Sequence, residues 1–221
     1  MELREYLSIR RAFNLVRQQM DTSGRLTFFE LAILCRLDVE GAPLNTSRIA
    51  EYQGSLRPTM THRTKHLSDL GLLDRTQGVE DRRNVVCSIS EAGRAYVEDI
   101  CQRICQELRG RNVLSRTMPR RICRYVDAMG SLSYMSGDLV LLGIVESSRG
   151  WSTVSELVAM LGLLQPTVSM SVSALEREGL VRRAQASEAS GRSAPIELTE
   201  EGALRADVII EEIRALVVRR G

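Results

Sequence analysis

A cluster of cations and hydroxyl groups at residues 57–66 is the part of the chain best suited to chemistry. His62 and His66 are the only two histidines, and Lys65 is the only lysine, in 221 residues. Hydroxyl, imidazole and ammonium groups on the first turns of a helix can bond to base edges or phosphates in a DNA groove. From this segment we expect DNA contacts by Arg57, Thr59, Thr61, His62, Lys65 and His66. A solvated polar face is the alternative interpretation.

Metal binding and catalysis are less well supported by these residue types. His62 and His66 stand four residues apart, as zinc ligands can, but no third ligand lies nearby in sequence, so we expect no metal. Catalysis would need a base beside a nucleophile or a pair of carboxylates, and the two histidines have no acidic partner at a useful spacing. We therefore expect neither enzymatic activity nor a cofactor.

The five cysteines form an odd set without regular spacing, which indicates reduced thiols rather than a disulfide framework. Cys101 and Cys105 stand four residues apart on an expected helix. We interpret them as small buried side chains in preference to redox sensors, because no pair of basic neighbours obviously lowers the pKa of both thiols. Arg103 and Arg109 are near enough in sequence to keep the sensor interpretation open.

The elements that must position these residues occur twice in the chain. Residues 56–75 align with residues 164–183 at a constant offset, and residues 90–93 recur as residues 199–202 after the offset slips by a single residue. A fixed period with one slip in a polar segment indicates two copies of one small fold. The expected domains are residues 1–117 and residues 118–221.

The first copy reads as helix, turn, helix and then a β-hairpin. Asn45 is a candidate N-cap for a short helix, and Pro58 suits the start of the next helix. The inward positions of that second helix are Met60, Thr64 and Leu67. Two short strands at residues 72–76 and 84–89 flank a polar tip and form a wing, after which Ser90 caps a long helix.

The second copy repeats these steps. A capping box at residues 153–156 opens a short helix, Pro166 opens the next, and Thr199 caps a terminal helix. The apolar positions expected on the terminal helix are Leu204, Val208, Ile209, Ile213 and Val217. Between the copies, Pro119 starts a helix that should occupy the place held by the N-terminal helix before the first copy.

The helix-turn-helix, the turn at residues 71–73 and the wing signature Asp81-Arg82-Arg83 together resemble the MarR family of bacterial transcriptional regulators. The resemblance covers residues 1–110 well and residues 118–220 more loosely, because Ser190 replaces the aspartate of the signature. It implies a mainly α fold with small β-wings, built as two winged helix-turn-helix domains with long flanking helices. Since single-copy members dimerise through terminal helices, the chain resembles an intramolecular pseudo-dimer, and further homodimerisation stays open.

The resemblance also implies roles for individual residues. Arg83 would reach into the minor groove, Asp81 would stabilise Arg83 or the hairpin through an ion pair, and Arg82 would lie close to phosphate. The corresponding DNA contacts of the second copy are Thr167, Ser169, Ser173 and Arg192. The helix of the second copy that begins near Pro166 carries no cation among its outward positions. It therefore either reads DNA weakly or binds a ligand or partner. We favour weak, asymmetric reading.

These features predict a sequence-specific DNA-binding transcriptional regulator whose partner is double-stranded DNA. The resemblance implies a repressor that responds to a small-molecule effector or an oxidant. A winged-helix protein-interaction scaffold, with little DNA binding by the second copy, is the alternative. The sequence has no apolar run of roughly 18 residues and no basic-then-apolar N-terminus, so we expect a cytoplasmic protein without membrane contact.

Overall fold

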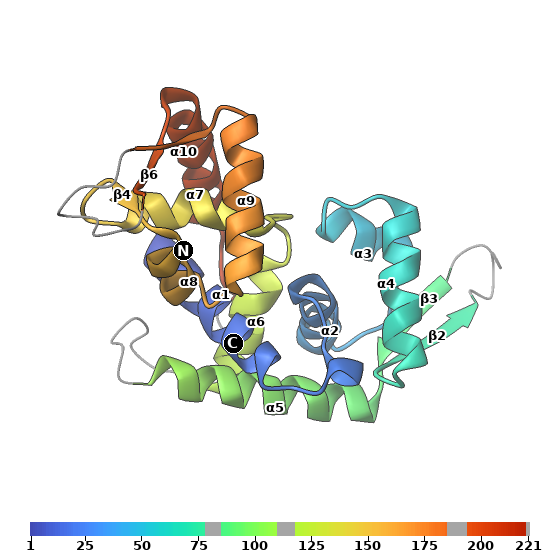
Figure 1. Ribbon diagram of the computed structural model, residues 1–221. Helices are drawn as coiled ribbons and strands as arrows, with labels where there is room; N and C mark the ends of the chain where they lie inside the picture. Colours follow the sequence, from blue (N-terminus) through green and yellow to red (C-terminus); the bar gives the residue numbers. More distant parts are fainter. Residues whose placement is uncertain (78–84, 110–117, 185–193, 220–221) are drawn as a thin grey trace. The chain divides into compact units, whose positions relative to one another are not determined.

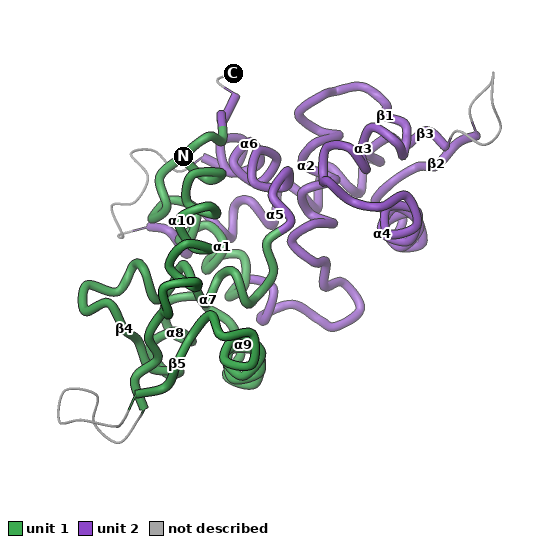
Figure 2. The backbone as a smooth tube through the Cα atoms, turned by 90° about the horizontal axis from the view of Figure 1, so that it is seen from above, with its two compact units in different colours: residues 1–15, 134–216 green, residues 16–133, 217–221 purple. Residues whose placement is uncertain are grey.

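The computed structural model of the chain describes residues 1–77, 85–109, 118–184 and 194–219 (Figure 1). These residues are mainly helical, with two small antiparallel sheets, as the sequence predicts. They form two compact units (Figure 2). Unit 1 comprises residues 1–15 and 134–216, and unit 2 comprises residues 16–133 and 217–221.

Unit 2 holds the first winged helix-turn-helix. Its elements are η1 (Thr22–Gly24), α2 (Phe28–Glu40), β1 (Leu44–Asn45), α3 (Thr46–Tyr52), α4 (Arg57–Asp69), β2 (Leu73–Gln77), β3 (Val85–Ile89), α5 (Glu91–Leu108) and α6 (Pro119–Met129). The strand order is β1-β3-β2, and both pairings are antiparallel. The predicted caps are present, because Asn45 Oδ1 accepts from the Arg48 amide at 2.8 Å and Ser90 Oγ accepts from the Gly93 amide at 3.0 Å.

Unit 1 holds the second winged helix-turn-helix. Its elements are α1 (Leu3–Gln18, whose last residues belong to unit 2), α7 (Ser136–Glu146), β4 (Trp151–Ser152), α8 (Val154–Leu161), α9 (Gln165–Arg177), β5 (Val181–Arg183), β6 (Ile196–Leu198) and α10 (Glu200–Ala215). The strand order β4-β6-β5 repeats that of unit 2. The capping box at Thr153 and the cap at Thr199 form as predicted.

A close approach at the start of α5 and of α10 shows how faithfully the fold repeats. A Cβ added to Gly93 would lie 2.1 Å from the carbonyl oxygen of Leu72, and one added to Gly202 would lie 1.9 Å from the carbonyl oxygen of Leu180. Real Cβ atoms do not come so close to backbone, so both positions require glycine. The same wing-to-helix junction is therefore built twice.

The first helix of each copy packs in the compact unit of the other copy. α6 packs on α2 and α5 in unit 2, where Arg36 on α2 pairs with Asp127 at 3.1 Å. α1 packs in unit 1, where Arg11 Nε donates to the Ala159 carbonyl at 2.8 Å and Asn14 donates to the Leu161 carbonyl at 2.9 Å. The compact units thus divide the chain differently from the domains 1–117 and 118–221.

The predicted apolar face of α10 is partly wrong. Leu204 and Val208 are 63% and 58% exposed, and Val217 lies beyond the end of the helix. Besides Gly202 in its first turn, the buried positions of α10 are Ala206, Ile209, Ile210 and Ile213. These four follow one another at the three- and four-residue steps of one helix face. Because apolar residues also lie on the exposed face of α10, the sequence alone does not indicate which face is buried.

Within the described ranges, no helix by itself is long and apolar enough to span a membrane. Among the described helices, one pair, α8 and α9, meets these criteria when taken together, and its two axes are bent by 118°.

Candidate nucleic-acid interface

α4 presents the predicted polar face to solvent. Met60, Thr64 and Leu67 are buried, and Thr64 Oγ1 donates to the Met60 carbonyl at 2.9 Å, so the inward face is as predicted. The exposed positions are Arg57, Thr59, Thr61, His62 and Lys65. The helix therefore displays a row of donors and cations of the kind that a DNA groove accepts.

The start of α4 leaves its backbone amides without a side-chain cap. Leu56 occupies the N-cap position, makes no capping hydrogen bond and is 77% exposed. α9 begins in the same way, with Leu164 as an uncapped N-cap that is 56% exposed. Uncapped first-turn amides together with the helix dipole favour an anion at this end, and phosphates of a DNA backbone meet that requirement.

His66, a predicted DNA contact, also binds to a carboxylate of its own unit. Its Nδ1 lies 2.6 Å from Glu30 Oε1 on α2, and the His66 side chain is 41% exposed. Glu30 is buried and also accepts from the amide and the hydroxyl of Thr27, each at 2.8 Å. Burial raises the pKa of Glu30, but the hydrogen bonds from Thr27 and His66 outweigh it and lower the pKa overall. His66 thus fixes α4 to the start of α2.

Arg63 and Gln53 are supporting residues that the sequence did not identify. The Arg63 guanidinium lies 4.6 Å from the ring centroid of Phe29 and donates to Gln53 Oε1 at 2.7 Å. Gln53 is fully buried and donates to the Phe29 carbonyl at 2.8 Å. Burial lowers the pKa of Arg63. These contacts orient α4 on α2 and α3, and they leave Arg63 less available to DNA than its exposed neighbours.

The wing strands are described, but the tip between them is not. β2 and β3 pair from Leu73 opposite Ile89 to Gln77 opposite Val85. The predicted residues Asp81, Arg82 and Arg83 of the first tip, and Arg192 of the second, lie outside the described residues.

The corresponding helix of unit 1 has a different charge arrangement. Ser173 is exposed, whereas Thr167 and Ser169 are half-buried. The cations that follow α9 are paired with carboxylates: Arg183 Nε lies 3.2 Å from Glu176 Oε2, and Arg182 bonds to Glu197 Oε2 at 3.0 and 2.9 Å. Arg183 also donates to Ser173 Oγ at 3.4 Å. For comparison, no carboxylate among the described residues pairs with Arg57, His62 or Lys65 on α4.

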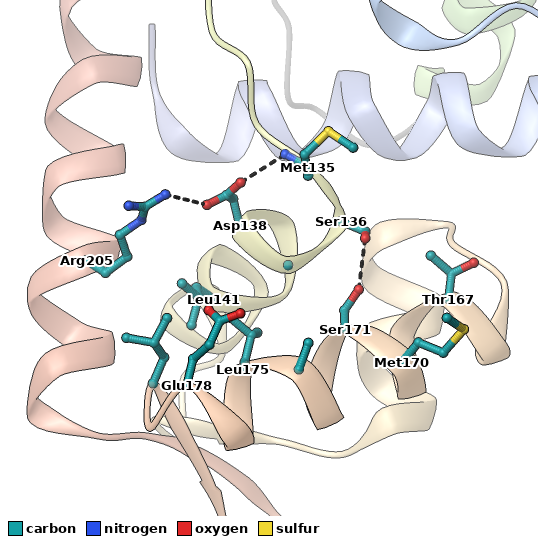
Figure 3. A pocket seen from close by; sticks show the side chains of 13 residues that line it. Met135, Ser136, Asp138, Leu141, Thr167, Met170, Ser171, Leu175, Glu178 and Arg205 are labelled. Atoms are coloured by element: carbon teal, nitrogen blue, oxygen red, sulfur yellow. Dashed lines mark hydrogen bonds and ion pairs between the residues drawn. The ribbon is translucent and has the colours of Figure 1, made fainter.

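A pocket of about 530 Å³ lies beside α9 in unit 1 (Figure 3). An ion pair at its edge joins Arg205 on α10 to Asp138 on α7 at 3.2 Å, and Asp138 also accepts from the Met135 amide at 2.9 Å. On the α9 side, Ser171 donates to Ser136 at 2.8 Å. Apolar side chains complete the wall, including Leu141, Leu175 and Met170. No sequence pattern marks this pocket, because its lining comes from three separate helices.

The residues considered for metal binding are not brought together. In the parts of the chain that the structure describes, no group of three or more histidine, cysteine, aspartate or glutamate side chains is arranged to hold a metal ion. His62 is exposed, and His66 faces Glu30.

Comparisons with known proteins place both copies in one family. Residues 26–85 and residues 134–193 each match a sequence model described as MarR family. A solved structure of Bordetella bronchiseptica BpsR, described as showing a mechanism for regulation of its DNA binding by 6-hydroxynicotinic acid, is 23% identical, with a TM-score of 0.38. It covers 47% of this chain and 80% of that chain. No curated protein matches.

Proposed function

We propose that this chain, which belongs to the MarR family of DNA-binding transcriptional regulators, is a repressor that binds the two half-sites of its operator with unequal strength. In this proposal the α4 surface, comprising Arg57, Thr59, Thr61, His62 and Lys65, reads one half-site strongly. The α9 surface, comprising Thr167, Ser169 and Ser173, reads the other half-site weakly. Repression follows from occupation of promoter DNA.

The different pairing of the cations on the two surfaces carries this proposal. Lys65 is exposed without a carboxylate partner among the described residues, so it can replace a counterion on phosphate. Arg183 must first leave Glu176, to which it is bound at 3.2 Å. Each phosphate contact contributes about 0.9 to the dependence of log affinity on log salt, so the unpaired surface contributes more to affinity.

Sequence reading should follow the same asymmetry. A good base contact discriminates against a wrong base by about 1–3 kcal/mol. We expect base changes under α4 to have effects of that size, and base changes under α9 to have smaller ones. The alternative, a protein-binding scaffold, predicts no base-specific effect at either half-site.

The experiment is a gel-shift and footprinting series with the DNA upstream of the protein's own gene. Lys65→Ala should weaken binding and reduce the salt slope by about 0.9. Arg103→Ala is the matched control, because it also removes one cation, which lies on α5 and pairs with Asp99 at 3.0 Å. Equal losses in both variants, or no retardation by the unmodified protein, would contradict the proposed surface.

Signal response is the second part of the proposal. MarR family regulators bind small-molecule effectors as well as DNA, and the pocket beside α9 combines apolar walls with Arg205. The ion pair with Asp138 uses one nitrogen of that guanidinium and leaves its other N–H donors for an anion. We place a small organic anion there, with its charge on Arg205 and its body against Met170 and Leu175. Saturation with a series of monocarboxylates should raise the melting temperature of the unmodified protein but not of Arg205→Gln. Equal shifts of the melting temperature in both proteins would show that Arg205 does not bind the anion.

A further inference from the structure

Four arginines line one pocket in unit 2. The pocket has a volume of about 810 Å³ and is lined by the start of α6 and by the last described residues of the chain. Arg120, Arg121 and Arg124 belong to α6, and Arg219 belongs to the C-terminal segment, which is part of the same unit. Among the described residues, no carboxylate lines this pocket. We call it the arginine pocket.

Most of these guanidinium groups have no acidic partner. In the described part of the chain, no carboxylate forms an ion pair with any of the three arginines of α6. Arg219 pairs with Glu40 at 2.8 Å, but the same carboxylate oxygen also pairs with Arg36 at 2.9 Å. One negative charge is therefore divided between two cations, and only one of these cations lines the pocket.

Two aspartates near these arginines have cations of their own. Asp38 on α2 lines a neighbouring hollow of about 310 Å³ together with two arginines of α6, and it pairs with Arg94 at 3.0 Å. Asp127 on α6 pairs with Arg36 at 3.1 Å, and burial raises the pKa of Asp127 to about 6. The arginine pocket therefore keeps an excess of positive charge.

The helix brings these positive charges together at an electrostatic cost. Arg120 and Arg124 stand four residues apart, so they share one face of α6, where like charges repel each other. Arg121 donates to the hydroxyl of Tyr125 at 3.3 Å, and its guanidinium lies 5.6 Å from the centroid of that ring. Arg121 and Arg124 are both half-buried and have lost part of their hydration. An anion in the pocket would reduce the repulsion and replace that hydration.

A chain of phosphates matches the chemistry and the size of this pocket. A guanidinium presents its N–H donors in a planar fork that fits two phosphate oxygens at once. Several such forks around one pocket favour an anion with several charges over a monocarboxylate, which a single fork satisfies. The volume of about 810 Å³ lies in the range of about 300–1,000 Å³ in which small ligands bind.

The arginine pocket is separate from the two surfaces described above. Figure 2 shows α6 and the C-terminal segment toward one end of unit 2 and α4 toward the other end. The pocket that contains Arg205 belongs to unit 1.

We propose that the arginine pocket binds an oligophosphate, which is a chain of two or more phosphates, free or as part of a nucleotide. The proposal rests on four guanidinium groups that line one pocket and on the lack of carboxylates in the described lining. It concerns unit 2 alone and requires neither DNA binding nor an anion at Arg205. Its test is therefore separate from the tests of the proposed function.

The experiment is isothermal titration calorimetry of the full chain without DNA, in a metal-free buffer of fixed ionic strength. The ligands are phosphate, pyrophosphate and tripolyphosphate, with sulfate for comparison. We expect affinity to increase with the number of phosphates, because each added phosphate contacts a further guanidinium. Tripolyphosphate binding that is no tighter than sulfate binding would overturn the proposal.

Variants locate the bound anion. Arg120→Gln and Arg124→Gln should each weaken tripolyphosphate binding by about tenfold or more, because each removes a charge-assisted contact with phosphate. Arg57→Gln is the matched control, since Arg57 is an exposed arginine on α4 without a carboxylate partner among the described residues. Equal losses in all three variants, or a loss in Arg57→Gln alone, would show that tripolyphosphate follows the net charge or binds at α4, and the proposal would be wrong.

Far-UV circular dichroism of each variant establishes that it is folded. Because Arg120 is exposed and has no acidic partner in the described residues, Arg120→Gln tests the pocket even if Arg124→Gln does not fold.

ATP distinguishes a free phosphate chain from a nucleotide, because ATP and tripolyphosphate carry the same number of phosphates. If ATP binds no more tightly than tripolyphosphate, the pocket binds the chain alone; tighter binding of ATP shows that the nucleoside is bound as well. Either result supports the site, provided that Arg120→Gln weakens the binding of both ligands. Binding of ATP without binding of tripolyphosphate would contradict the proposal, because the phosphates would then not be the group that the pocket recognises.

Discussion

Freeing a cation beside α9 should strengthen DNA binding by the weaker surface. In Glu176→Gln the carboxylate that holds Arg183 is replaced by a neutral side chain of nearly the same shape. Arg183 Nε lies 3.2 Å from that carboxylate, and the two side chains are 39% and 42% exposed. The released guanidinium can then neutralise a phosphate without first breaking an ion pair.

The size of the effect follows from the geometry. At 3.2 Å two unit charges attract by about 1.3 kcal/mol in bulk water, and exposed pairs in proteins contribute only about 0.2–1 kcal/mol. The substitution therefore leaves the fold intact. One added phosphate contact steepens the salt slope by about 0.9, which is about eightfold in affinity, or about 1.2 kcal/mol, at 0.1 M salt.

The assay is fluorescence anisotropy titration of operator DNA at several salt concentrations. Glu211→Gln provides the control, because it frees Arg214 from an exposed pair of 2.7 Å on α10 rather than beside α9. We expect a steeper slope for Glu176→Gln and an unchanged slope for Glu211→Gln. If the two variants have the same slope as the unmodified protein, Arg183 does not contact DNA phosphate, which contradicts weak DNA binding beside α9.

Further predictions concern stability. Gly93→Ala and Gly202→Ala should each destabilise the protein by about 1–3 kcal/mol in urea unfolding, since the new Cβ meets the carbonyl oxygen of Leu72 or Leu180. Gly24→Ala is the control, because nothing lies within 4 Å of its added Cβ. Equal losses of stability in all three variants would exclude the clash as the cause. In Glu30→Gln the free energy of unfolding should fall less steeply with decreasing pH than in the unmodified protein. The folded pKa of Glu30 is lowered, so its contribution is present above the usual value of 4.5 and is lost as pH falls through the folded pKa. Urea midpoints measured across that range check this, and parallel curves for variant and unmodified protein would contradict it.

Local features of this fold could be predicted from the sequence because they depend on neighbouring residues. Asn45, Ser90 and Thr199 cap helices as expected, since each side chain bonds to an amide only three residues away. The inward face of α4 could be predicted in the same way, because helical periodicity places Met60, Thr64 and Leu67 on one side of the helix.

Long-range partners could not be predicted in this way. The bond between His66 and Glu30 joins two helices, α4 and α2, and no spacing within either helix indicates it. Nothing in the sequence near α9 indicates that Arg183 selects Glu176 or that Arg182 selects Glu197. The pairing of Arg36 with Asp127 likewise depends on how α2 and α6 pack, which no local spacing encodes.

The exchange of α1 and α6 between the compact units has a consequence for how the chain is made. α1 belongs mainly to unit 1, but the rest of that unit begins only at Tyr134. At about 5–20 residues per second, α1 leaves the ribosome on the order of ten seconds before the first of its partners is synthesised. During that interval Tyr6, Ile9 and Phe13, which are buried in the finished protein, lack the surface that covers them. This segment of the nascent chain should therefore need protection from aggregation. In addition, neither copy can be expressed as one contiguous piece that retains all its packing partners, because each compact unit is built from two separate stretches of the chain.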